Sequence, residues 1–423
     1  MDTTEARASA PTTAQPARPA HRDGNVLRWL VAHTASLVGD SVYFVALAWS
    51  AQKVAAPGEV GLVMAAGAVP RALLMLGGGV VADRFGPRRI VVTADGVRCV
   101  IVLAVAAGVA LTTPALWLLV TVALLFGAVD ALFVPAVGAL PSRLTDLDQL
   151  ARVTGMRALS MRLSQIAGPP VGGLAMGHGG AGTAFAIAGL LFALSLPLLL
   201  TLRLRPLDTR DTDRPVSRTA RQDLLDGLRH IRGNRLVLPL VIALAISEFG
   251  LTGTLNVGLV LLGDERGWGP SGYGTIVSAF GAGAAISAAL LAKAGWVPRA
   301  GLVLTGTLFG GCLGAAGIAL VPTLPYAVAT AAVIGVCAGV FGSLDNALVL
   351  TATDPAHLGR TTSVLMLTMV GIAPLSYPIV GAAIGAVGAT PVFVGCGAFA
   401  SLGVVVALAA GPVRRAELPR PDR

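Results

Sequence analysis

Long apolar runs separated by short polar segments cover most of the chain. Each run matches the ~20 residues that a helix needs to cross the ~30 Å hydrocarbon core of a membrane. Six runs precede a polar, arginine-rich stretch and six follow it, which predicts an all-α membrane protein with twelve transmembrane helices in two pseudo-symmetric six-helix bundles. The predicted spans cover residues 28–50, 59–82, 89–111, 115–140, 153–177, 181–202, 236–262, 271–292, 300–321, 325–350, 361–388 and 390–411.

The polar segments set the domain boundaries. The first residues are rich in Ala, Pro and Thr and contain no apolar core, so we expect a disordered tail and no secretory signal peptide. The sequence DLLDGLRHI, between the halves, has the pattern of an amphipathic surface helix, although a solvated linker is the favoured interpretation. The predicted parts are a tail over 1–27, an N-terminal bundle over 28–203, a basic linker over 204–235, a C-terminal bundle over 236–411 and a second tail over 412–423.

Composition and charge exclude a water-soluble enzyme. Of the 423 residues, 55% are hydrophobic and only 13% are charged, whereas soluble domains carry about 25% charged residues. The net charge of +9 does not indicate a nucleic-acid partner, because the basic residues collect in alternate loops. Only Lys53 and Arg266 fall on the poorer side, so the positive-inside rule predicts a multi-pass plasma-membrane protein whose termini are both cytoplasmic.

The segment GGVVADRFGPRRIVV, between the second and third spans, carries a loop motif. Its spacing resembles the G-x-x-x-D-R-x-G-R-R signature of the major facilitator superfamily, at the position where that family carries it. The resemblance implies a cytoplasmic gate in which the aspartate bonds to arginines and faces the N-terminal end of span 11, here near Thr361. The motif residues are Gly79, Asp83, Arg84, Gly86, Arg88 and Arg89.

A second motif lies in span 5. The sequence IAGPPVGGLAM resembles the G-P-x-x-G-G pattern that marks antiporters within the superfamily, through Gly168, Pro169, Gly172 and Gly173. Proline removes a helical hydrogen bond and glycine opens a groove, so this helix is expected to bend and pack tightly where the halves move against each other.

The whole chain from about residue 26 to residue 411 resembles the transmembrane secretion effector branch of the superfamily. That branch includes enterobactin-type siderophore exporters and macrolide-efflux-like proteins. The resemblance rests on SLVGDSVYFVALAW in span 1, AVPRALLMLGGGVVADRFG in span 2, AVDALFVPAVGALPSRLTD in span 4 and GRTTSVLMLTMVGIAPL in span 11. Span 4 departs from many proton antiporters of the superfamily, because it lacks their coupling arginine.

Ionisable side chains within the spans are the candidate functional residues, because embedding a charge in a membrane is costly. We place Asp40 and Arg71 at similar depths on consecutive helices, near the middle of the membrane. Burial favours a neutral carboxyl group and a nearby arginine favours a charged one, so Asp40 facing Arg71 could exchange protons; a static ion pair is the alternative. The seven embedded residues are Asp40, Arg71, Asp95, Arg98, Asp130, Glu248 and Asp345.

The other embedded charges suggest different roles. Glu248 has no embedded basic partner in its half, which suits proton binding or recognition of a cation. Asp95 and Arg98 stand three residues apart and could satisfy each other, or Arg98 could pair with Asp130. Asp345 could line the cavity or belong to a satisfied polar patch. Five acids against two bases favour cations and protons over anions.

These patterns together predict a secondary transporter, not an enzyme. We expect a monomer that exports a hydrophobic or amphipathic small molecule, such as a drug, antibiotic or secondary metabolite, by alternating access in exchange for protons. A siderophore exporter and a lysophospholipid flippase are alternatives within transport. A polytopic membrane transferase is disfavoured because no metal-diphosphate cluster or sizeable catalytic loop is present. We predict no catalytic residues, no metal site and no cofactor, with the lipid bilayer as the surrounding partner.

Overall fold

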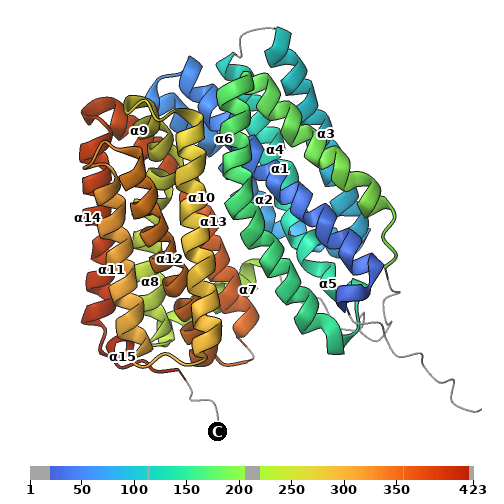
Figure 1. The fold of residues 1–423 in the computed structure, drawn as a ribbon. Helices are drawn as coiled ribbons and strands as arrows, with labels where there is room; N and C mark the ends of the chain where they lie inside the picture. Colours follow the sequence, from blue (N-terminus) through green and yellow to red (C-terminus); the bar gives the residue numbers. More distant parts are fainter. Residues whose placement is uncertain (1–19, 112–114, 205–219, 356, 419–423) are drawn as a thin grey trace, which may run out of the picture.

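The computed structural model describes residues 20–111, 115–204, 220–355 and 357–418, and within these ranges the chain forms helices and no strand (Figure 1). The helices are η1 (Ala20–Arg22), α1 (Gly24–Val54), α2 (Pro57–Phe85), α3 (Pro87–Leu111), α4 (Leu116–Ala139), α5 (Pro141–Leu144), α6 (Leu147–Leu200), α7 (Ala220–Gly233), α8 (Val237–Gly253), the π-helical turn η3 (Thr254–Gly258), α9 (Leu259–Glu265), α10 (Gly269–Ala294), α11 (Ala300–Ile318), α12 (Leu324–Ala352), α13 (Leu358–Val387), α14 (Ala389–Ala409) and α15 (Gly411–Arg414).

The membrane-spanning architecture predicted from the hydropathy pattern is confirmed. Eleven helical segments of the described chain are long and apolar enough to cross a membrane. One of them, α6, covers the predicted span 153–177 and the predicted span 181–202 as far as Leu200, with a kink between the two spans at Gly180, where the backbone is not helical. Gly180 has a φ of 71°, a left-handed conformation that glycine adopts without the steric cost that a side chain would add.

The spans form two bundles, which Figure 1 shows side by side. In the N-terminal bundle α1 packs on α6, α2 packs on α4, and α3 packs on both α4 and α6. In the C-terminal bundle α10 packs on α12, α11 packs on α12 and α14, and α8 packs on α14. Leu73, Val100 and Trp117 are each about 70% exposed in the isolated chain, as expected for side chains that contact lipid.

The two bundles contact each other mainly through α2 against α13 and α6 against α10. In Figure 1 they lie close at the top and diverge at the bottom, where α5, α7 and α15 lie. We call the bottom the terminal end, because α1 begins there and the C-terminus lies there, and the top the closed end. Hydrogen bonds join the halves away from the terminal end, from Ser278 Oγ to the Ile166 carbonyl oxygen at 2.7 Å and from Gln52 Nε2 to Asp264 Oδ2 at 3.2 Å.

Two boundaries differ from the sequence-based expectation. Helix α1 begins at Gly24, before the predicted start at residue 28, because Asp23 caps it by accepting a 2.8 Å hydrogen bond from the Asn25 amide. Within the predicted linker 204–235, the chain forms helix α7, where a solvated linker was favoured. The predicted tail residues 1–19 and 419–423, and linker residues 205–219, lie outside the described residues.

Helix α7 is held against the start of α13. Asp226 forms an ion pair with Arg360 at 3.7 Å, and the rings of His230 and His357 stack with their centroids 4.3 Å apart. Ile231 is almost fully buried, so one side of this amphipathic helix packs on the C-terminal bundle. Ile231 therefore has a packing partner in the C-terminal bundle, whereas Leu225 and Leu228 of the same segment are exposed.

Candidate transport site

Helix α3 brings two charged residues inside the N-terminal bundle. Asp95, Arg98 and Val102 are buried at the spacing of helical turns, whereas Val97 and Val100 between them are exposed. The helical period therefore directs Asp95 and Arg98 to the same inner face. The sequence places both charges on the side of α3 that cannot contact lipid.

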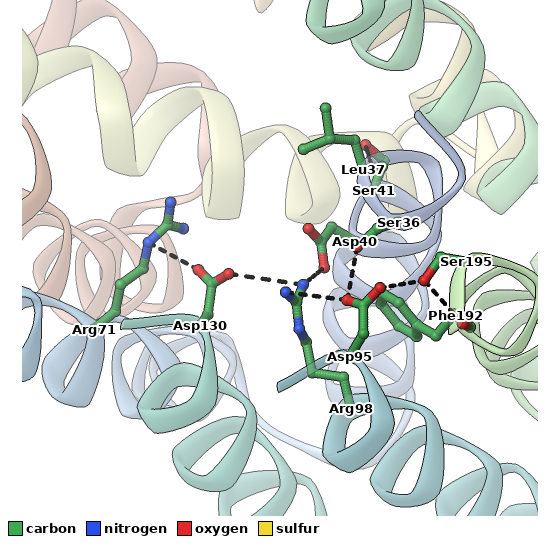
Figure 2. A network of polar contacts seen from close by, with 10 residues as sticks. All are labelled: Ser36, Leu37, Asp40, Ser41, Arg71, Asp95, Arg98, Asp130, Phe192 and Ser195. Carbon is green, nitrogen blue, oxygen red and sulfur yellow. Dashed lines mark hydrogen bonds and ion pairs between the residues drawn. The ribbon is translucent and has the colours of Figure 1, made fainter. Parts of the chain in front are cut away.

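Arg98 is the centre of a network of ion pairs, drawn in Figure 2. Its guanidinium group lies 2.7 Å from Asp40, 3.4 Å from Asp95 and 3.9 Å from Asp130. The Arg98 side chain is fully buried, so these carboxyl groups replace the hydration that it loses. We call Asp40, Arg71, Asp95, Arg98 and Asp130 the N-terminal charge cluster.

Aromatic rings surround the guanidinium group of Arg98. Its central carbon lies 3.6 Å from the ring centroid of Phe133, 5.4 Å from that of Phe192 and 5.7 Å from that of Phe126. Cations are attracted to the faces of aromatic rings, more strongly where water is excluded. The rings thus hold the guanidinium in place, an arrangement that the sequence alone did not indicate.

Asp95 has the most complete set of partners among the carboxyl groups of this cluster. It accepts a hydrogen bond of 2.9 Å from Ser36 Oγ and another from Ser195 Oγ, in addition to its ion pair with Arg98. The predicted pairing of Asp95 with Arg98 is therefore confirmed. The two serines were missed by sequence reasoning. Ser195 is a single hydroxyl within an otherwise apolar run, and Ser36 follows His33 and Thr34, so neither serine is distinguished by its pattern.

Arg71 pairs with Asp130, and Asp130 in turn approaches Arg98. The Arg71 Nε lies 3.1 Å from Asp130 Oδ2, and the Arg71 side chain is 37% exposed. Asp130 thus lies between the two arginines, with one carboxyl oxygen toward each. The alternative that Asp130 partners Arg98 is confirmed at 3.9 Å, alongside this shorter contact with Arg71.

The expected pairing of Asp40 with Arg71 is wrong. Asp40 pairs with Arg98, and Arg71 pairs with Asp130. Equal depth on consecutive helices did not bring the two side chains together, because α1 packs chiefly on α6 whereas α2 packs on α4 and α13. The rotation of each helix about its axis, set by these neighbours, decided the pairing.

A cavity of about 400 Å³ lies between the halves. Arg71 and Asp130 line it from the N-terminal bundle, and Glu248, Thr252 and Tyr377 line it from the C-terminal bundle. Glu248 accepts a 2.6 Å hydrogen bond from the Thr252 hydroxyl group. Embedded charges of the two halves therefore face one space, although their positions in the sequence are far apart.

A second cavity of about 760 Å³ adjoins the first, because Glu248, Thr252, Asn256 and Tyr273 line both. Most of its wall comes from the C-terminal helices α8, α10, α11, α12 and α13. Asp345, on α12, is one of its lining residues. The structure thus places Asp345 at a cavity wall, which was one of the two alternatives for this residue.

The loop motif between α2 and α3 is only partly described. Gly86 has a φ of 85°, a conformation that glycine adopts readily and that allows the tight turn between α2 and α3. Arg88 donates hydrogen bonds to the carbonyl oxygens of Leu199 and Leu200 at the end of α6, and so neutralises a helix C-terminus. Arg84 and Arg89 are exposed. The surroundings of Gly79 and the side chain of Asp83 lie outside the described residues, so the expected gate contacts of Asp83 stay a prediction.

The G-P-x-x-G-G motif lies where α6 meets both α1 and α10. A Cβ atom added at Gly172 would lie 3.1 Å from Val42 and Val45 of α1. One added at Gly173 would overlap the Pro270 carbonyl oxygen of α10, and Ser271 donates a 3.3 Å hydrogen bond to the Gly173 carbonyl oxygen. Tight packing at this motif is confirmed, and it lies at the junction of the two halves.

Two six-helix bundles that meet at one end of a polar central cavity define a polytopic membrane transport protein. The family model described as Major Facilitator Superfamily matches residues 29–368, and the chain belongs to this superfamily.

Curated relatives are about a quarter identical to this chain over the aligned residues. The enterobactin exporter EntS of Shigella boydii serotype 18 is 26% identical over 285 residues, which is 67% of this chain and 66% of the relative. EntS of Escherichia coli O1:K1 / APEC has the same identity and coverage. The chain thus aligns with just under two thirds of the length of these relatives.

Solved structures share the fold at lower identity. A mutant of the nucleoside transporter NupG has a TM-score of 0.74 at 12% identity, covering 92% of this chain and 100% of that one. A bacterial homologue of the human lysosomal transporter Spinster has a TM-score of 0.72 at 14% identity, covering 95% and 99%. These similarities confirm the fold class.

Proposed function

We propose that the chain is a secondary transporter of the plasma membrane that exports an amphipathic small molecule in exchange for protons, acting as a monomer. The observation that carries this proposal is the N-terminal charge cluster beside the central cavity. Its three carboxyl groups face two guanidinium groups, so one bound proton makes the cluster neutral and its release leaves one negative charge. A cluster with this surplus carboxyl group can bind and release a proton while most of its charges stay paired.

Asp40 is the carboxyl group best suited to carry that proton. Its side chain is 16% exposed, more than those of Asp95 and Asp130, and its ion pair is with Arg98 alone. Asp95 is held by two serine hydroxyl groups as well as Arg98, and Asp130 lies between two arginines. A proton on Asp40 therefore disrupts the fewest contacts.

The basic loops support an orientation in the membrane from which we propose the direction of transport. If the positive-inside rule holds, the terminal end faces the cytoplasm and the closed end faces outward. The bundles diverge toward the terminal end (Figure 1), an arrangement that supports the proposed uptake of substrate from the cytoplasmic side. Protonation from outside and proton release to the cytoplasm would drive the reverse movement of the substrate.

Siderophore export is a second candidate, and the match to the enterobactin exporters favours it. This candidate shares the fold, the direction and the proton-coupling site, and differs only in the molecule carried. One assay with a panel of molecules therefore separates the candidates.

The test uses the full chain in proteoliposomes with an imposed pH gradient. The panel contains ethidium, a neutral macrolide-like lactone and enterobactin, and proton movement is followed with an internal pH dye. We expect Asp40→Asn to lower gradient-driven transport by about tenfold or more, because it removes the exchangeable proton. Exchange of labelled for unlabelled substrate without a gradient should persist, since it needs no proton step.

The matched control is Glu265→Gln, which removes an exposed carboxyl group outside the cavity and should transport as the wild type does. Transport of enterobactin alone would assign the second candidate. Full gradient-driven transport by the Asp40→Asn variant, or no transport of any panel member, would contradict the proposal.

A further inference from the structure

The cavity of about 760 Å³ in the C-terminal half holds carboxyl groups with no arginine or lysine partner among the described residues. Glu248 of α8 and Asp345 of α12 both line it. Arg162 of α6 is a basic residue in its wall, and that guanidinium group donates a 3.1 Å hydrogen bond to Gln165 Oε1. The N-terminal charge cluster differs, because there each carboxyl group has an arginine.

Asp345 is the most unusual group in this cavity. The residue is only 6% exposed, and its Oδ1 atom is buried with no hydrogen-bond partner in the part of the chain that the structure describes. Helix α12 contains no Lys, Arg or His. A buried carboxyl group without a partner is costly, so a structure retains it where something else binds there.

Glu248 supplies a second carboxyl group to the same space. Its contact within the described chain is the hydrogen bond from Thr252, which leaves further oxygen lone pairs for another donor. Helix α8 carries no basic residue either. Two carboxyl groups on facing helices, both at one cavity wall, therefore have no arginine or lysine of the described chain within ion-pair distance.

Much of the rest of the wall is apolar and partly aromatic, although polar residues such as Thr307, Ser343 and Asn346 also line it. Ile276, Phe280, Phe341 and Met366 are among the residues that form it. Such a surface suits the hydrocarbon or aromatic body of a ligand, and aromatic faces also attract organic cations.

We infer that Glu248 and Asp345 form a binding site for an amphipathic organic cation, whose ammonium or amidinium group supplies the missing counter-charge while its body contacts the apolar wall. This inference rests on the proposed transport function and names its substrate class. It assigns recognition of the charge on the substrate to the C-terminal half and proton exchange to the N-terminal half. The two acidic groups of the cavity are then not part of the proton cycle.

The test measures binding, so that it does not depend on transport. The full chain in lipid nanodiscs is titrated with radiolabelled tetraphenylphosphonium and with triphenylphosphine oxide, a neutral molecule with similar rings. We expect the wild type to prefer the cation. Asp345→Asn and Glu248→Gln should each weaken cation binding by about tenfold or more, because a buried carboxyl group loses its charge. Binding of the neutral molecule should change little.

Two further variants separate folding defects and proton coupling from recognition. Asp345→Glu keeps the charge and should retain most of the cation affinity, and a single symmetric peak in size-exclusion chromatography confirms that each variant is folded. Asp40→Asn should bind the cation as the wild type does, even where its proton-driven transport is lost. Cation binding unaffected by both Asp345→Asn and Glu248→Gln, equal affinity for the neutral molecule, or no cation binding by the wild type would each overturn the inference. If the wild type binds the cation selectively but shows no proton-driven transport, this inference stands and the proposed proton coupling is wrong.

Discussion

At the scale of single residues, the fully buried guanidinium group of Arg98 organises the N-terminal bundle. It lies within 4 Å of three carboxyl groups and against the ring of Phe133. Removing one partner of a buried ion pair is much more damaging than never having had the pair, because the remaining charges keep their desolvation cost.

We therefore predict that Arg98→Met lowers the free energy of unfolding by about 3–5 kcal/mol. The variant leaves Asp40 and Asp95 without the arginine that they share. The apparent melting temperature of the purified protein in detergent is the measurement. Arg89→Met, which removes an exposed arginine of the same helix, is the control and should melt as the wild type does.

A second substitution tests the reason for that loss. Adding Asp95→Asn to Arg98→Met removes one of the uncompensated charges and should recover part of the lost melting temperature. If the double variant melts below the single one, buried charge is not the cause of the instability.

At the scale of elements, the contact of α6 with α10 determines how closely the halves approach. Gly173 lets the helices pack backbone to backbone, because a side chain there would meet the Pro270 carbonyl oxygen. The hydrogen bonds of Ser271 and Ser278 to carbonyl oxygens of α6 lie along the same contact. This contact must open when the halves separate at the closed end and approach each other at the terminal end.

We predict that Gly173→Leu favours the conformation in which the two halves have separated at the closed end. Overpacking costs about 1–3 kcal/mol, which shifts an equilibrium by roughly five- to 150-fold. In a background with Cys99, Cys312, Cys337 and Cys396 replaced, a reporter cysteine at Phe44, a cavity-lining position, should react faster with an impermeant thiol reagent added from the closed end.

Gly138→Leu is the control for this experiment. Gly138 lies on α4 and would meet no atom within 4 Å of an added Cβ, so the reporter should react as in the parent. An unchanged labelling rate in the Gly173→Leu variant would show that this contact does not hold the closed end shut.

At the scale of the whole molecule, transport by alternating access requires the closed end to open. The side chains of Gln52 at the end of α1 and Asp264 in α9 form a 3.2 Å hydrogen bond between the two halves. Both lie on the side opposite the terminal end, so a covalent link between them would hold the halves together there.

We predict that cross-linking Gln52→Cys to Asp264→Cys with a short bifunctional thiol reagent abolishes transport, and that a cleavable reagent allows reduction to restore it. The readout is transport in proteoliposomes before and after reduction. A cross-link between Asn25→Cys and Arg203→Cys is the control, because these residues already contact each other within one half and should stay together during transport. Continued transport by the cross-linked Gln52 and Asp264 variant would rule out opening at this end.

Much of the architecture could be predicted from the sequence because it depends on local pattern. Each apolar run is long enough to cross a bilayer, and the backbone of such a run must satisfy its own hydrogen bonds as a helix. The i, i+3 spacing of Asp95 and Arg98 likewise fixed their contact, since both lie on one helical face. The turn at Gly86 and the tight packing of the span 5 motif belong to the same class of local information.

Only the tertiary structure decided how each helix is oriented about its own axis and which helices become neighbours. Asp40 pairs with Arg98 and not with Arg71, and an amphipathic linker segment became helix α7 by packing on α13. The single hydroxyl groups of Ser36 and Ser195 became partners of Asp95, and Asp345 came to line the same cavity as Glu248. The sequence by itself determined which residues are embedded, because hydropathy is a local property. Their partners depended on side-chain packing between helices that are distant in sequence, which no local pattern encodes.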